Sequence, residues 1–562
     1  MGEPVEQRAG PMTRATLLFL GASVSQLPAI RYALDAGYRV AAADGEATAP
    51  GLALAHASTA IDFSDVERVA EWAESIRVDG ILAISTDRGV VPAAAIAAKL
   101  GLPGIGTDVA RAMTDKARMR ATLAAGGICQ PRHRVARTGA ELERALGELR
   151  LPVVMKPADS GGQRGVFLIE DPGDAARHLE ESLSFSCGRA AIVEEYVEGT
   201  ELNVLAAVRD GEATVLTISD RLRPRGAGFG VGWIHSFPSS LDRGTLDDVH
   251  AVVASSVQAL GLRDGIAFPQ VIASPEGISV VEVAARIAAG QMADLVRYST
   301  GIELYRIAVA QALGERVPDD DVRPRFIRPV AIRFLTASPG VLPVGEVTSI
   351  SGMNAVRAAP GVLAADMYIG TGARIRPVQV DADRNGYVVA TGDTPEDALA
   401  RADDASRLLV VSTTSEPRRA ARRRTYRRRA LVAGFAVVLA AASAVAIGFS
   451  QGTALSRPLV TATRVDAVLA PLCRCDRSVA HVSFRLARRT RISLEMLSAP
   501  GRVAAHVARN RLAGPGMVRL AWRGRTLLGR ALPDGSYTPV LVLPALRETV
   551  RLPAVEIVGP PR

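Results

Sequence analysis

The sequence predicts an α/β and α+β protein that continues into one transmembrane helix and a C-terminal all-β sandwich. Three observations support this prediction. Short apolar strands alternate with helices near the start of the chain, residues 430–449 contain no charge, and apolar and polar residues alternate beyond residue 480. With 562 residues the chain is too long for a single hydrophobic core, so we expect several domains.

Composition and charge favour ordered domains and argue against a nucleic-acid partner. The chain is 48% hydrophobic and 22% charged, which is typical of globular proteins. Its net charge is +9, but eight arginines lie between Arg418 and Arg429, and without them the net charge is about +1. We therefore expect no large basic face. Aromatic residues make up only 4% and are not interleaved with basic ones, unlike a platform for single-stranded nucleic acid.

The first elements predict a parallel α/β domain over residues 14–106. The expected order is a strand at 16–20, the turn Gly21-Ala-Ser, a helix through Tyr32, strands at 38–43 and 80–84, and a helix at 91–100. This alternation is typical of a parallel sheet with helices on its faces. The turn lacks the glycine spacing of a dinucleotide loop, so we expect an accessory domain rather than an NAD site.

Only three lysines occur in this arginine-rich chain, namely Lys99, Lys116 and Lys156. Lys116 follows Asp115 at the start of a helical stretch, and Lys156 ends an apolar strand before a glycine-rich loop. Two explanations are open. Each lysine survives by chance on a solvated face, or a compact ammonium is needed where the planar guanidinium of arginine does not fit. The motifs that follow favour the second explanation for Lys116 and Lys156.

Residues 80–305 contain several motifs in an order that resembles the ATP-grasp superfamily. The motifs are Asp115-Lys116, the strand end at Lys156, Ser160-Gly-Gly-Gln-Arg-Gly165, and Glu194-Glu-Tyr-Val197 followed by Glu201. The resemblance implies the ATP-grasp fold, with a Rossmann-like domain at 14–106 and an ATP-grasp domain at 107–327. The nucleotide contacts that it implies are Lys116, Lys156, Ser160, Gly161, Gly162, Gly165, Glu194, Val197 and Glu201.

The resemblance also implies a role for each of these residues. The two lysines reach the phosphates, and the glycine loop folds over them, since backbone N–H groups approach anionic oxygens most closely where no Cβ intervenes. Glu194 and the backbone of Val197 meet the adenine, while the carboxylate of Glu201 accepts hydrogen bonds from the ribose hydroxyls. The alternative for this segment is an edge strand with solvated glutamates.

The paired strands expected at 265–283 resemble the part of ATP-grasp enzymes that holds magnesium (or manganese) over the β- and γ-phosphates. Gln270 and Glu282 are the expected metal ligands, because phosphates and water complete the octahedron. Arg286 is expected to stabilise the γ-phosphate and the developing acyl phosphate. Ala284 stands where the family usually has Asn or Asp. This departure leaves open a weaker second metal, a ligand from elsewhere, or reduced catalysis.

An arginine- and glycine-rich region at 221–235 resembles the border of the family's acceptor pocket. Arg221, Arg223 or Arg225 is expected to bind a substrate carboxylate in a bidentate manner. His235 is a candidate base, although a lone histidine is more often structural. The segment Gly290-Gln-Met-Ala-Asp294 is a further candidate for the wall of this pocket.

Residues 328–412 resemble the C-terminal domain of L-amino-acid ligases and of relatives of the biotin carboxylase type. Strands are expected near 329–336 and 386–390, with a helix after Thr394. No biotin-acceptor sequence occurs, so tethered biotin is not implied. The resemblance extends to carbamoyl-phosphate synthetase, which has Gln at the position of Gln270.

A basic juxtamembrane linker at 413–429 and a transmembrane helix at 430–449 are expected next. The 20 uncharged residues are long enough to cross a hydrocarbon core, and a buried helix is the alternative. Arginines at one end predict that this end stays in the cytoplasm, together with residues 1–429, which lack an apolar signal region. Binding of anionic headgroups is a second role open to the arginines. Cys473 and Cys475 would lie outside, where oxidation can occur.

The exported segment, residues 450–562, is expected to be a β-sandwich. Apolar side chains alternate at 482–486, 492–496 and 518–522, and turn signals stand at Pro500-Gly and Pro533-Asp-Gly. Over roughly 465–558 the pattern resembles the Ig-like module of flagellar hook capping proteins. That resemblance implies a structural or interaction role, and we expect contact with cell-surface components.

Together these features predict a membrane-anchored ATP-grasp ligase with its active site in the cytoplasm. Small-molecule carboxylate and amine substrates are expected, with ATP and Mg²⁺ (or Mn²⁺) as cofactors. ADP and phosphate would be the by-products of amide formation, and a homodimer is left open. The alternative is a non-catalytic, ATP-binding transmembrane module that signals to or organises the outer domain.

Overall fold

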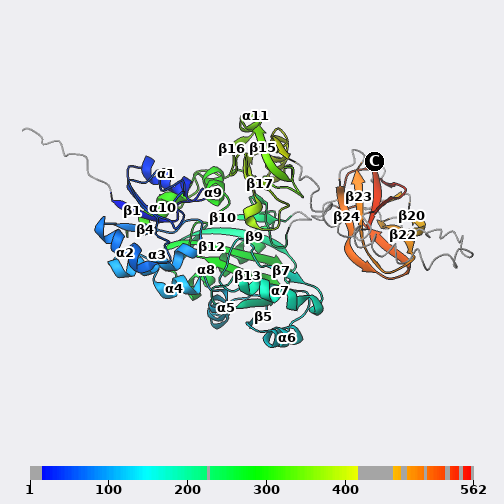
Figure 1. Ribbon diagram of the computed structural model, residues 1–562. Helices are drawn as coiled ribbons and strands as arrows, with labels where there is room; N and C mark the ends of the chain where they lie inside the picture. Colours follow the sequence, from blue (N-terminus) through cyan, green and yellow to red (C-terminus); the bar gives the residue numbers. More distant parts are fainter. Residues whose placement is uncertain are drawn as a thin grey trace, which may run out of the picture. The chain divides into compact units, whose positions relative to one another are not determined.

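A computed structural model of the chain describes eight stretches of residues. They are 15–223, 228–414, 460–466, 468–469, 478–498, 503–525, 532–543 and 548–558. The chain falls into two compact units, Met1–Ala420 and Ala421–Arg562, each of which is described by itself (Figure 1).

The first unit begins with a four-stranded parallel sheet in the order β3-β2-β1-β4. Its strands are β1 (Thr16–Leu20), β2 (Arg39–Ala43), β3 (Ala57–Thr59) and β4 (Gly80–Leu82). Its helices are α1 (Leu27–Asp35), α2 (Val66–Ser75), the 3₁₀ turn η1 (Asp87–Gly89) and α3 (Val90–Leu100). Every residue of β1 is buried, as expected for a parallel strand covered on both faces. The predicted parallel α/β arrangement is confirmed.

A small antiparallel sheet follows, in the order β5-β8-β6-β7. Its strands are β5 (His133–Ala136), β6 (Val153–Pro157), β7 (Phe167–Ile169) and β8 (Ala191–Glu195). Before it come α4 (Thr107–Ala112) and α5 (Lys116–Ala125), and two further helices, α6 (Gly139–Glu148) and α7 (Pro172–Ser184), cover one face. Leu142 of α6 and Leu179 of α7 share a core with Val153 and Val193. The opposite face of this sheet is left for the site described below.

The largest sheet has eight antiparallel strands in the order β13-β12-β9-β10-β11-β14-β18-β16. They are β9 (Thr200–Arg209), β10 (Glu212–Leu222), β11 (Ile234–Phe237), β12 (Gly265–Ser274), β13 (Gly277–Ala284), β14 (Val330–Phe334), β16 (Val362–Met367) and β18 (Gly386–Thr391). The remaining helices of this part are α8 (Arg243–Leu260), α9 (Met292–Thr300), α10 (Leu304–Ala312) and the turn η2 (Asp319–Asp321). Helix α8 packs Val253 against Val204 of β9, while Ile307 of α10 belongs to the core that holds Leu205. Strand β9 is therefore buried from both sides.

This sheet runs across the expected boundary at residues 327 and 328, because β14, β18 and β16 extend it. The other elements of the region are β15 (Gly345–Ser351), α11 (Met353–Ala358), β17 (Arg374–Ile375), η3 (Asp381–Asp383), α12 (Pro395–Ser406) and β19 (Val410–Thr414). Strands β17, β15 and β19 form a separate small sheet. In Figure 1, α11 and strands β15, β16 and β17 lie together at one end of the unit.

The described residues of the second unit are β strands arranged in two sheets. One sheet has the order β20-β22-β25, the other β21-β28-β26-β23-β24 with β27 paired to β26. The strands are β20 (Val460–Val465), β21 (Val468–Leu469), β22 (Ala480–Leu486), β23 (Thr490–Ser498), β24 (Val503–Ala513), β25 (Gly516–Trp522), β26 (Gly535–Leu543), β27 (Glu548–Arg551) and β28 (Val555–Ile557). Phe484 from one sheet and Leu494 from the other share a core, so two packed sheets are confirmed and the Ig-like likeness stays a prediction.

Several predicted features lie outside the described residues: Arg225, the span at 430–449, Cys473 and Cys475. Among the helices that the structure describes, none combines the length and the apolar character needed to cross a bilayer.

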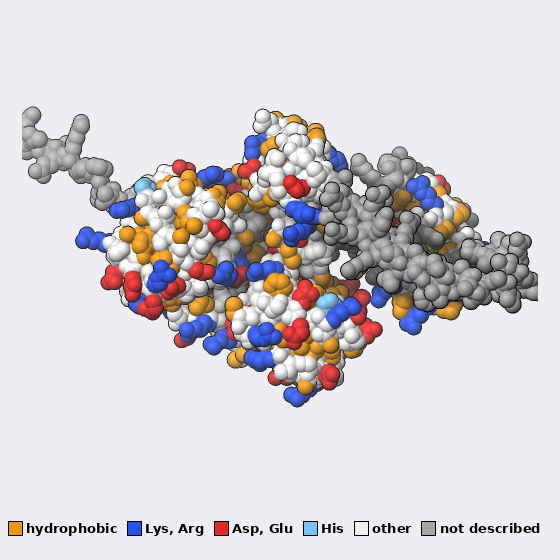
Figure 2. Space-filling view, in the orientation of Figure 1, with side chains coloured by type: hydrophobic (Ala, Val, Ile, Leu, Met, Phe, Trp, Pro, Cys, Tyr) orange, Lys and Arg blue, Asp and Glu red, His pale blue; other side chains and the backbone are white. Residues whose placement is uncertain are grey.

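The two units carry opposite charges. Residues 1–414 contain 41 Lys and Arg against 51 Asp and Glu, whereas residues 460–562 contain 17 Arg against six Asp and Glu. The balance of about +1 outside the arginine cluster hides this difference between the units, and the expectation of no large basic face stays a prediction. The exposed arginines of the second unit include Arg464, Arg485, Arg488, Arg489, Arg491, Arg511, Arg519, Arg523, Arg525 and Arg551. On the face of the first unit in Figure 2, blue and red side chains are interspersed.

Candidate functional site

A cavity of about 400 Å³ lies between the small sheet and the large sheet of the first unit. Strands β6 and β8 of the small sheet supply Lys156 and Glu194, and strands β12 and β13 of the large sheet supply Gln270 and Glu282. The turns η1 and η3 close it from the N-terminal sheet and from the C-terminal end of the unit. The cavity thus draws on three separate parts of the chain.

A buried charge triad forms the nucleotide end of this cavity. Lys156 Nζ lies 2.5 Å from Glu194 Oε1, and Arg120 Nη2 donates to Glu194 Oε2 over 2.7 Å. The pairing follows from register: Val154 stands opposite Glu194, so Lys156 and Glu194 project from the same face of adjacent strands. Burial by itself raises the pKa of Glu194, but the two cations lower that pKa to about 2.

Glu195, the neighbour of Glu194, projects from the opposite face. It accepts hydrogen bonds from Arg150 Nε at 3.2 Å and Arg150 Nη2 at 3.0 Å. The relative exposure of Glu194 is 4% and that of Glu195 is 7%. The alternative of an edge strand with solvated glutamates is therefore excluded.

Arg120 is a residue that sequence reasoning missed. It is 1% exposed, and its Nη1 and Nη2 donate to the carbonyls of Val280 and Val281 at 2.8 and 2.9 Å, which ties α5 to β13. A signal for it exists, because Arg120 stands four residues after Lys116 and so lies on the same helix face.

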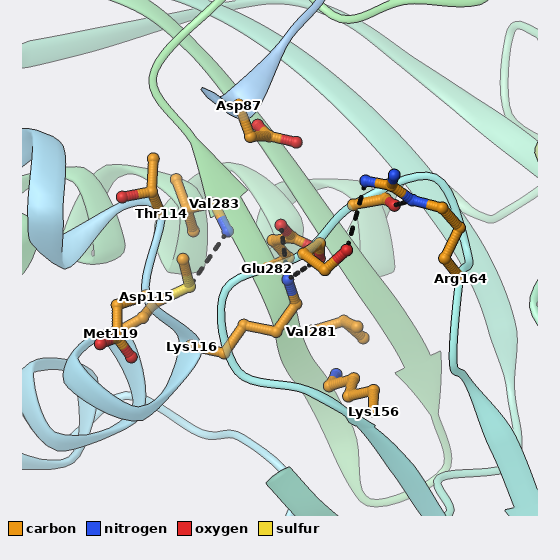
Figure 3. Close-up of polar contacts among 12 residues, drawn as sticks. Asp87, Thr114, Asp115, Lys116, Met119, Lys156, Arg164, Val281, Glu282 and Val283 are labelled. Carbon is orange, nitrogen blue, oxygen red and sulfur yellow. Dashed lines mark hydrogen bonds and ion pairs between the residues drawn. The ribbon is translucent and has the colours of Figure 1, made fainter. Parts of the chain in front are cut away.

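Lys116 connects the glycine loop to the metal end of the cavity. Asp115 caps α5 by accepting from the backbone N–H of Ala117 at 2.8 Å, which makes Lys116 the first residue of the helix. Lys116 Nζ donates to the carbonyl of Ser160 at 2.9 Å and lies 3.3 Å from Glu282 Oε1 (Figure 3). The side chains of Lys116 and Lys156 are each only 7% exposed. Among the three lysines, survival on a solvated face fits only Lys99.

The glycine loop between Ser160 and Gly165 needs its glycines for geometric reasons. Gly165 has φ +68°, and a Cβ there would lie 3.2 Å from the Cα of Ser182. A Cβ on Gly161 would lie 2.7 Å from Asp87 Oδ2. The loop can therefore lie against both its own domain and the N-terminal sheet only without side chains at these positions.

Two of the three arginines expected to bind a substrate carboxylate, Arg221 and Arg223, are paired with a carboxylate of this chain. Arg221 Nη1 lies 2.6 Å from Glu201 Oε2, and Arg223 pairs with the other oxygen of the same carboxylate. Glu201, Arg221 and Arg223 all line the cavity, as does Val197. The expected roles at the ribose and at a carboxylate stay predictions, and the structure places both guanidinium groups beside Glu201.

Gln270 and Glu282 stand directly opposite each other on β12 and β13. Gln270 Nε2 donates to Asn203 Oδ1 at 3.0 Å, which leaves the amide oxygen of Gln270 for a cation. In the part of the chain that the structure describes, no three acidic, histidine or cysteine residues cluster as a complete metal site. Two protein oxygens beside two lysines suit magnesium that arrives bound to phosphates. Ala284 also lines the cavity and supplies no ligand.

A chain of hydrogen bonds links the metal end to His235. Asn203 bridges Gln270 and His235, with 3.0 Å between Asn203 Nδ2 and His235 Nδ1. Burial, together with Arg221 and Arg384, holds the pKa of His235 far below its usual range. A neutral His235 that accepts at Nδ1 carries its proton on Nε2, so it is a donor rather than a base there. Asn203 was missed, although a polar residue between Leu202 and Val204 in an apolar strand is a usable signal.

Arg286 faces a carboxylate that the sequence did not suggest. Its Nε and Nη2 donate to the two oxygens of Asp87 at 2.8 and 2.9 Å. Its Nη1 is buried and has no hydrogen-bond partner among the described residues. Asp87 follows strand β4 at the carboxyl end of the parallel sheet, which is where such sheets place functional residues.

The C-terminal end of the unit contributes Asp381 and Arg384. The backbone N–H of Asp381 donates to the carbonyl of Gly162 at 3.2 Å, and Arg384 Nη1 donates to the carbonyl of Gly232 at 3.1 Å. Oδ1 of Asp381 is buried and has no partner within the described ranges. Neither residue was predicted. Met292, from the candidate segment 290–294, also lines the cavity.

Two segments of this chain match family models. Residues 149–294 match the model described as ATP-grasp domain, and residues 333–414 match L-amino acid ligase C-terminal domain 2. These two matches cover strands β6, β7 and β8 of the small sheet, the strands with Gln270 and Glu282, and the C-terminal end with Asp381, whereas β5, Lys116 and Arg120 lie outside them. Residues 149–294 are therefore similar in sequence to ATP-grasp domains.

Individual proteins are similar over parts of the chain. The uncharacterized protein y4rH of Sinorhizobium fredii is 29% identical over 299 residues, which are 52% of this chain and 60% of that protein. Dapdiamide A synthase of Enterobacter agglomerans is 27% identical over 189 residues, which are 33% of this chain and 44% of that protein. The chain thus spans less than two thirds of either relative.

Solved structures share the fold. L-amino acid ligase from Bacillus licheniformis has a TM-score of 0.63 at 19% identity and covers 72% of this chain and all of its own. Phosphoribosylglycinamide synthetase from Anaerococcus prevotii has a TM-score of 0.59 at 22% identity and covers 71% of this chain and all of its own. The predicted ATP-grasp α/β fold is thereby confirmed.

Proposed function

We propose that this chain, with its ATP-grasp domain, is an ADP-forming carboxylate–amine ligase that uses ATP and Mg²⁺. The observation that supports the proposal most is the charge pattern of the cavity. Lys116 and Lys156, whose side chains are each only 7% exposed, line it together with the glycine loop, Gln270 and Glu282. Cations and carboxylates are balanced in the lining, six of each, so the attraction for a triphosphate depends on these two buried ammonium groups and on the unpartnered Nη1 of Arg286.

In the proposed reaction a substrate carboxylate oxygen attacks the γ-phosphorus of ATP. The bond from that phosphorus to the β–γ bridging oxygen breaks, and ADP leaves. The amine then attacks the carbonyl carbon of the acyl phosphate. Phosphate leaves and takes up the surplus proton of the amine. Protein side chains form no covalent bond, so positioning and charge compensation provide the catalysis.

Each end of the cavity has its own task in this reaction. Lys156 and Lys116 neutralise phosphate oxygens, and Gln270 and Glu282 would hold magnesium, which supplies further charge compensation at the β- and γ-phosphates. Arg286 offers its unpartnered Nη1 to the transferred phosphoryl group. His235 donates from Nε2 to a substrate oxygen rather than removing a proton.

We also propose that residues 430–449 anchor the enzyme in the cell membrane. Support comes from the 20 uncharged residues and the adjacent arginine cluster. In this proposal residues 1–429 lie in the cytoplasm, and the β unit beyond residue 450 lies outside as an Ig-like module. Labelling of single cysteines introduced at 420 and 510 by a membrane-impermeant thiol reagent on intact cells tests it. Labelling at 420 or none at 510 would contradict it.

The ligase is tested with the full chain in a mild detergent, Mg²⁺·ATP and a pool of amino acids and small carboxylates. We expect ADP and phosphate to appear only with an acceptor present, and Glu282→Ala to abolish both. Glu276→Ala, on the exposed turn between β12 and β13, is the matched control that keeps activity.

One observation favours a second candidate function. Ala284 provides no ligand at a usual metal position, as a non-catalytic ATP-binding module would allow. That module would bind ATP and release no ADP with any acceptor, so the same assay separates the two functions.

A further inference from the structure

Asp87 and Arg286 form a bidentate ion pair across two domains. The residues are 199 positions apart in the chain, and both guanidinium-to-carboxylate hydrogen bonds are shorter than 3.0 Å. The side chain of Arg286 is 11% exposed and that of Asp87 is 26% exposed. Two parallel hydrogen bonds fix the plane of a guanidinium as well as its position, unlike a single contact.

The loop that carries Asp87 is itself fastened to the segment after β13. The backbone N–H of Ser85 donates to the carbonyl of Ile287 at 3.0 Å, and Ser85 adopts φ +60° to do so. Gln26 Nε2 holds the preceding carbonyl, that of Ile84, at 2.9 Å. Asp87 therefore approaches Arg286 from a fixed backbone, not from a loose loop.

The pair leaves one donor of Arg286 for another purpose. Nε and Nη2 are engaged by Asp87, and the guanidinium carbon lies 5.9 Å from the centre of the Phe268 ring. Nη1 is buried without a hydrogen-bond partner in the described part of the chain, and Arg286 lines the cavity. A buried guanidinium N–H without a partner is costly, which indicates a missing acceptor such as a phosphoryl oxygen.

Asp87 is charged in this environment. Burial raises its pKa, but Arg286 and Lys116 outweigh burial and keep the pKa below its ordinary value. The alternative that Asp87 replaces the metal ligand missing at Ala284 fits the geometry less well, because both of its oxygens already accept from Arg286.

We call the part of the cavity lined by Asp87, Arg286 and Asp381 the acceptor end. We propose that Asp87 is a positioning residue there: it orients Arg286 so that Nη1 meets the transferred phosphoryl group. The N-terminal sheet thereby completes a site whose other parts belong to the ATP-grasp domain. The expected effect of changing Asp87 on turnover rests on the proposed ligase function. The expected effect on nucleotide binding does not, because binding can be measured without turnover.

The test compares Asp87→Asn with Asp87→Glu and with the control Asp62→Asn in the full chain. Asp62 belongs to the same domain and pairs with Arg88 at 3.5 Å on the exposed surface. For Asp87→Asn we expect kcat to fall about 10–100-fold, as when one oriented donor is lost from a transition state. The ADP affinity stays within about twofold of wild type, and the preference for ATP over ADP falls several-fold, because only ATP offers the γ-phosphate.

Asp87→Glu, which keeps the charge, recovers part of kcat, and Asp62→Asn behaves as wild type. Unchanged kcat and unchanged ATP preference in Asp87→Asn would overturn the inference. So would an equal loss of ATP and ADP binding, which signals general disruption, or a raised Mg²⁺ requirement, which signals a metal ligand. If the wild-type protein released no ADP with any acceptor, the ligase function would be refuted instead. The positioning role of Asp87 would then be tested only by the preference for ATP over ADP.

Discussion

The nucleotide end and the acceptor end of the cavity are built in different ways. At the nucleotide end, Lys156, Glu194 and Arg120 form a closed triad in which each charge has a partner. At the acceptor end, Arg286 Nη1 and Asp381 Oδ1 are buried without partners among the described residues. Arg120 Nε is also buried without a partner among the described residues, but Arg120 does not line the cavity. The unsatisfied groups that a substrate can reach therefore lie at the acceptor end.

This difference indicates where stability and where specificity reside. Breaking a complete buried triad leaves an uncompensated charge and costs folding energy as well as binding. Removing a group that has no partner in the free protein costs little until the substrate is present. Variants at the two ends should therefore separate into those that affect stability and those that affect only catalysis.

The largest effect is expected for Lys156→Met at the nucleotide end. The substitution leaves Glu194 with Arg120 alone and removes a phosphate contact, and breaking a buried pair costs about 3–5 kcal/mol. We expect ATP affinity to fall at least about 100-fold in a calorimetric titration, together with a lower unfolding temperature.

Lys99→Met is the control for that variant, because Lys99 forms an exposed pair with Glu67 and such pairs contribute about 1 kcal/mol or less. An ATP affinity of Lys156→Met equal to that of Lys99→Met would remove the nucleotide end from the proposed site.

The next effect is the pH dependence of the same triad. The pKa of Glu194 is about 2 in the folded protein against an ordinary value of 4.5, a depression worth about 3 kcal/mol. A depressed carboxyl pKa stabilises the fold above pH 4.5, and the contribution is lost as the pH falls towards 2. We expect the difference in unfolding free energy between wild type and Glu194→Gln to shrink by about 3 kcal/mol from pH 6 to pH 2. A difference that stays constant with pH would contradict this charge state.

The same contrast explains how much could be predicted from the sequence. Lys116, Lys156 and the glycine loop lie in continuous motifs. Asp115 marks the helix cap before Lys116, the apolar run marks the strand that ends at Lys156, and the glycines mark the loop that follows. The parallel sheet of the N-terminal domain and the pair β12 and β13 were equally visible from alternation and turns.

Residues whose partners are distant in the chain could not be found in that way. Asp87 meets Arg286 only because the loop after β4 is held against the segment after β13. Asp381 reaches Gly162 only because β14 and β18 extend the large sheet. The opposite net charges of the two units can be counted from the sequence, but a single net charge for the whole chain does not reveal them.

A smaller effect is expected at the junction of the two ends, in Asn203→Leu. This change keeps the size of the side chain and removes both hydrogen bonds, one to Gln270 and one to His235. His235 is buried and Gln270 is half-buried, and a buried group that loses its partner costs about 1–3 kcal/mol. We expect about a 10-fold or greater fall in kcat with a raised Mg²⁺ requirement, measured by ADP release against Mg²⁺ concentration. An unchanged Mg²⁺ requirement would separate Gln270 from metal binding.

The smallest effect is expected for Asp381→Asn at the acceptor end. The buried Oδ1 of Asp381 has no partner in the described residues, while Oδ2 lies 3.3 Å from Arg384 Nη2. The amine that attacks the acyl phosphate carries N–H groups, and these match an unpartnered carboxylate oxygen. We expect the KM for the amine to rise about 10-fold with ATP affinity unchanged. The unfolding temperature should fall only slightly, because the amide weakens the pair with Arg384 but removes no hydrogen bond of Oδ1. Asp320→Asn, on an exposed pair with Arg323, is the control. A KM for the amine equal to that of the control would place amine recognition elsewhere in the cavity. A loss of stability as large as that of Lys156→Met would show instead that Asp381 is a structural residue like those of the triad, and the contrast between the two ends would fail.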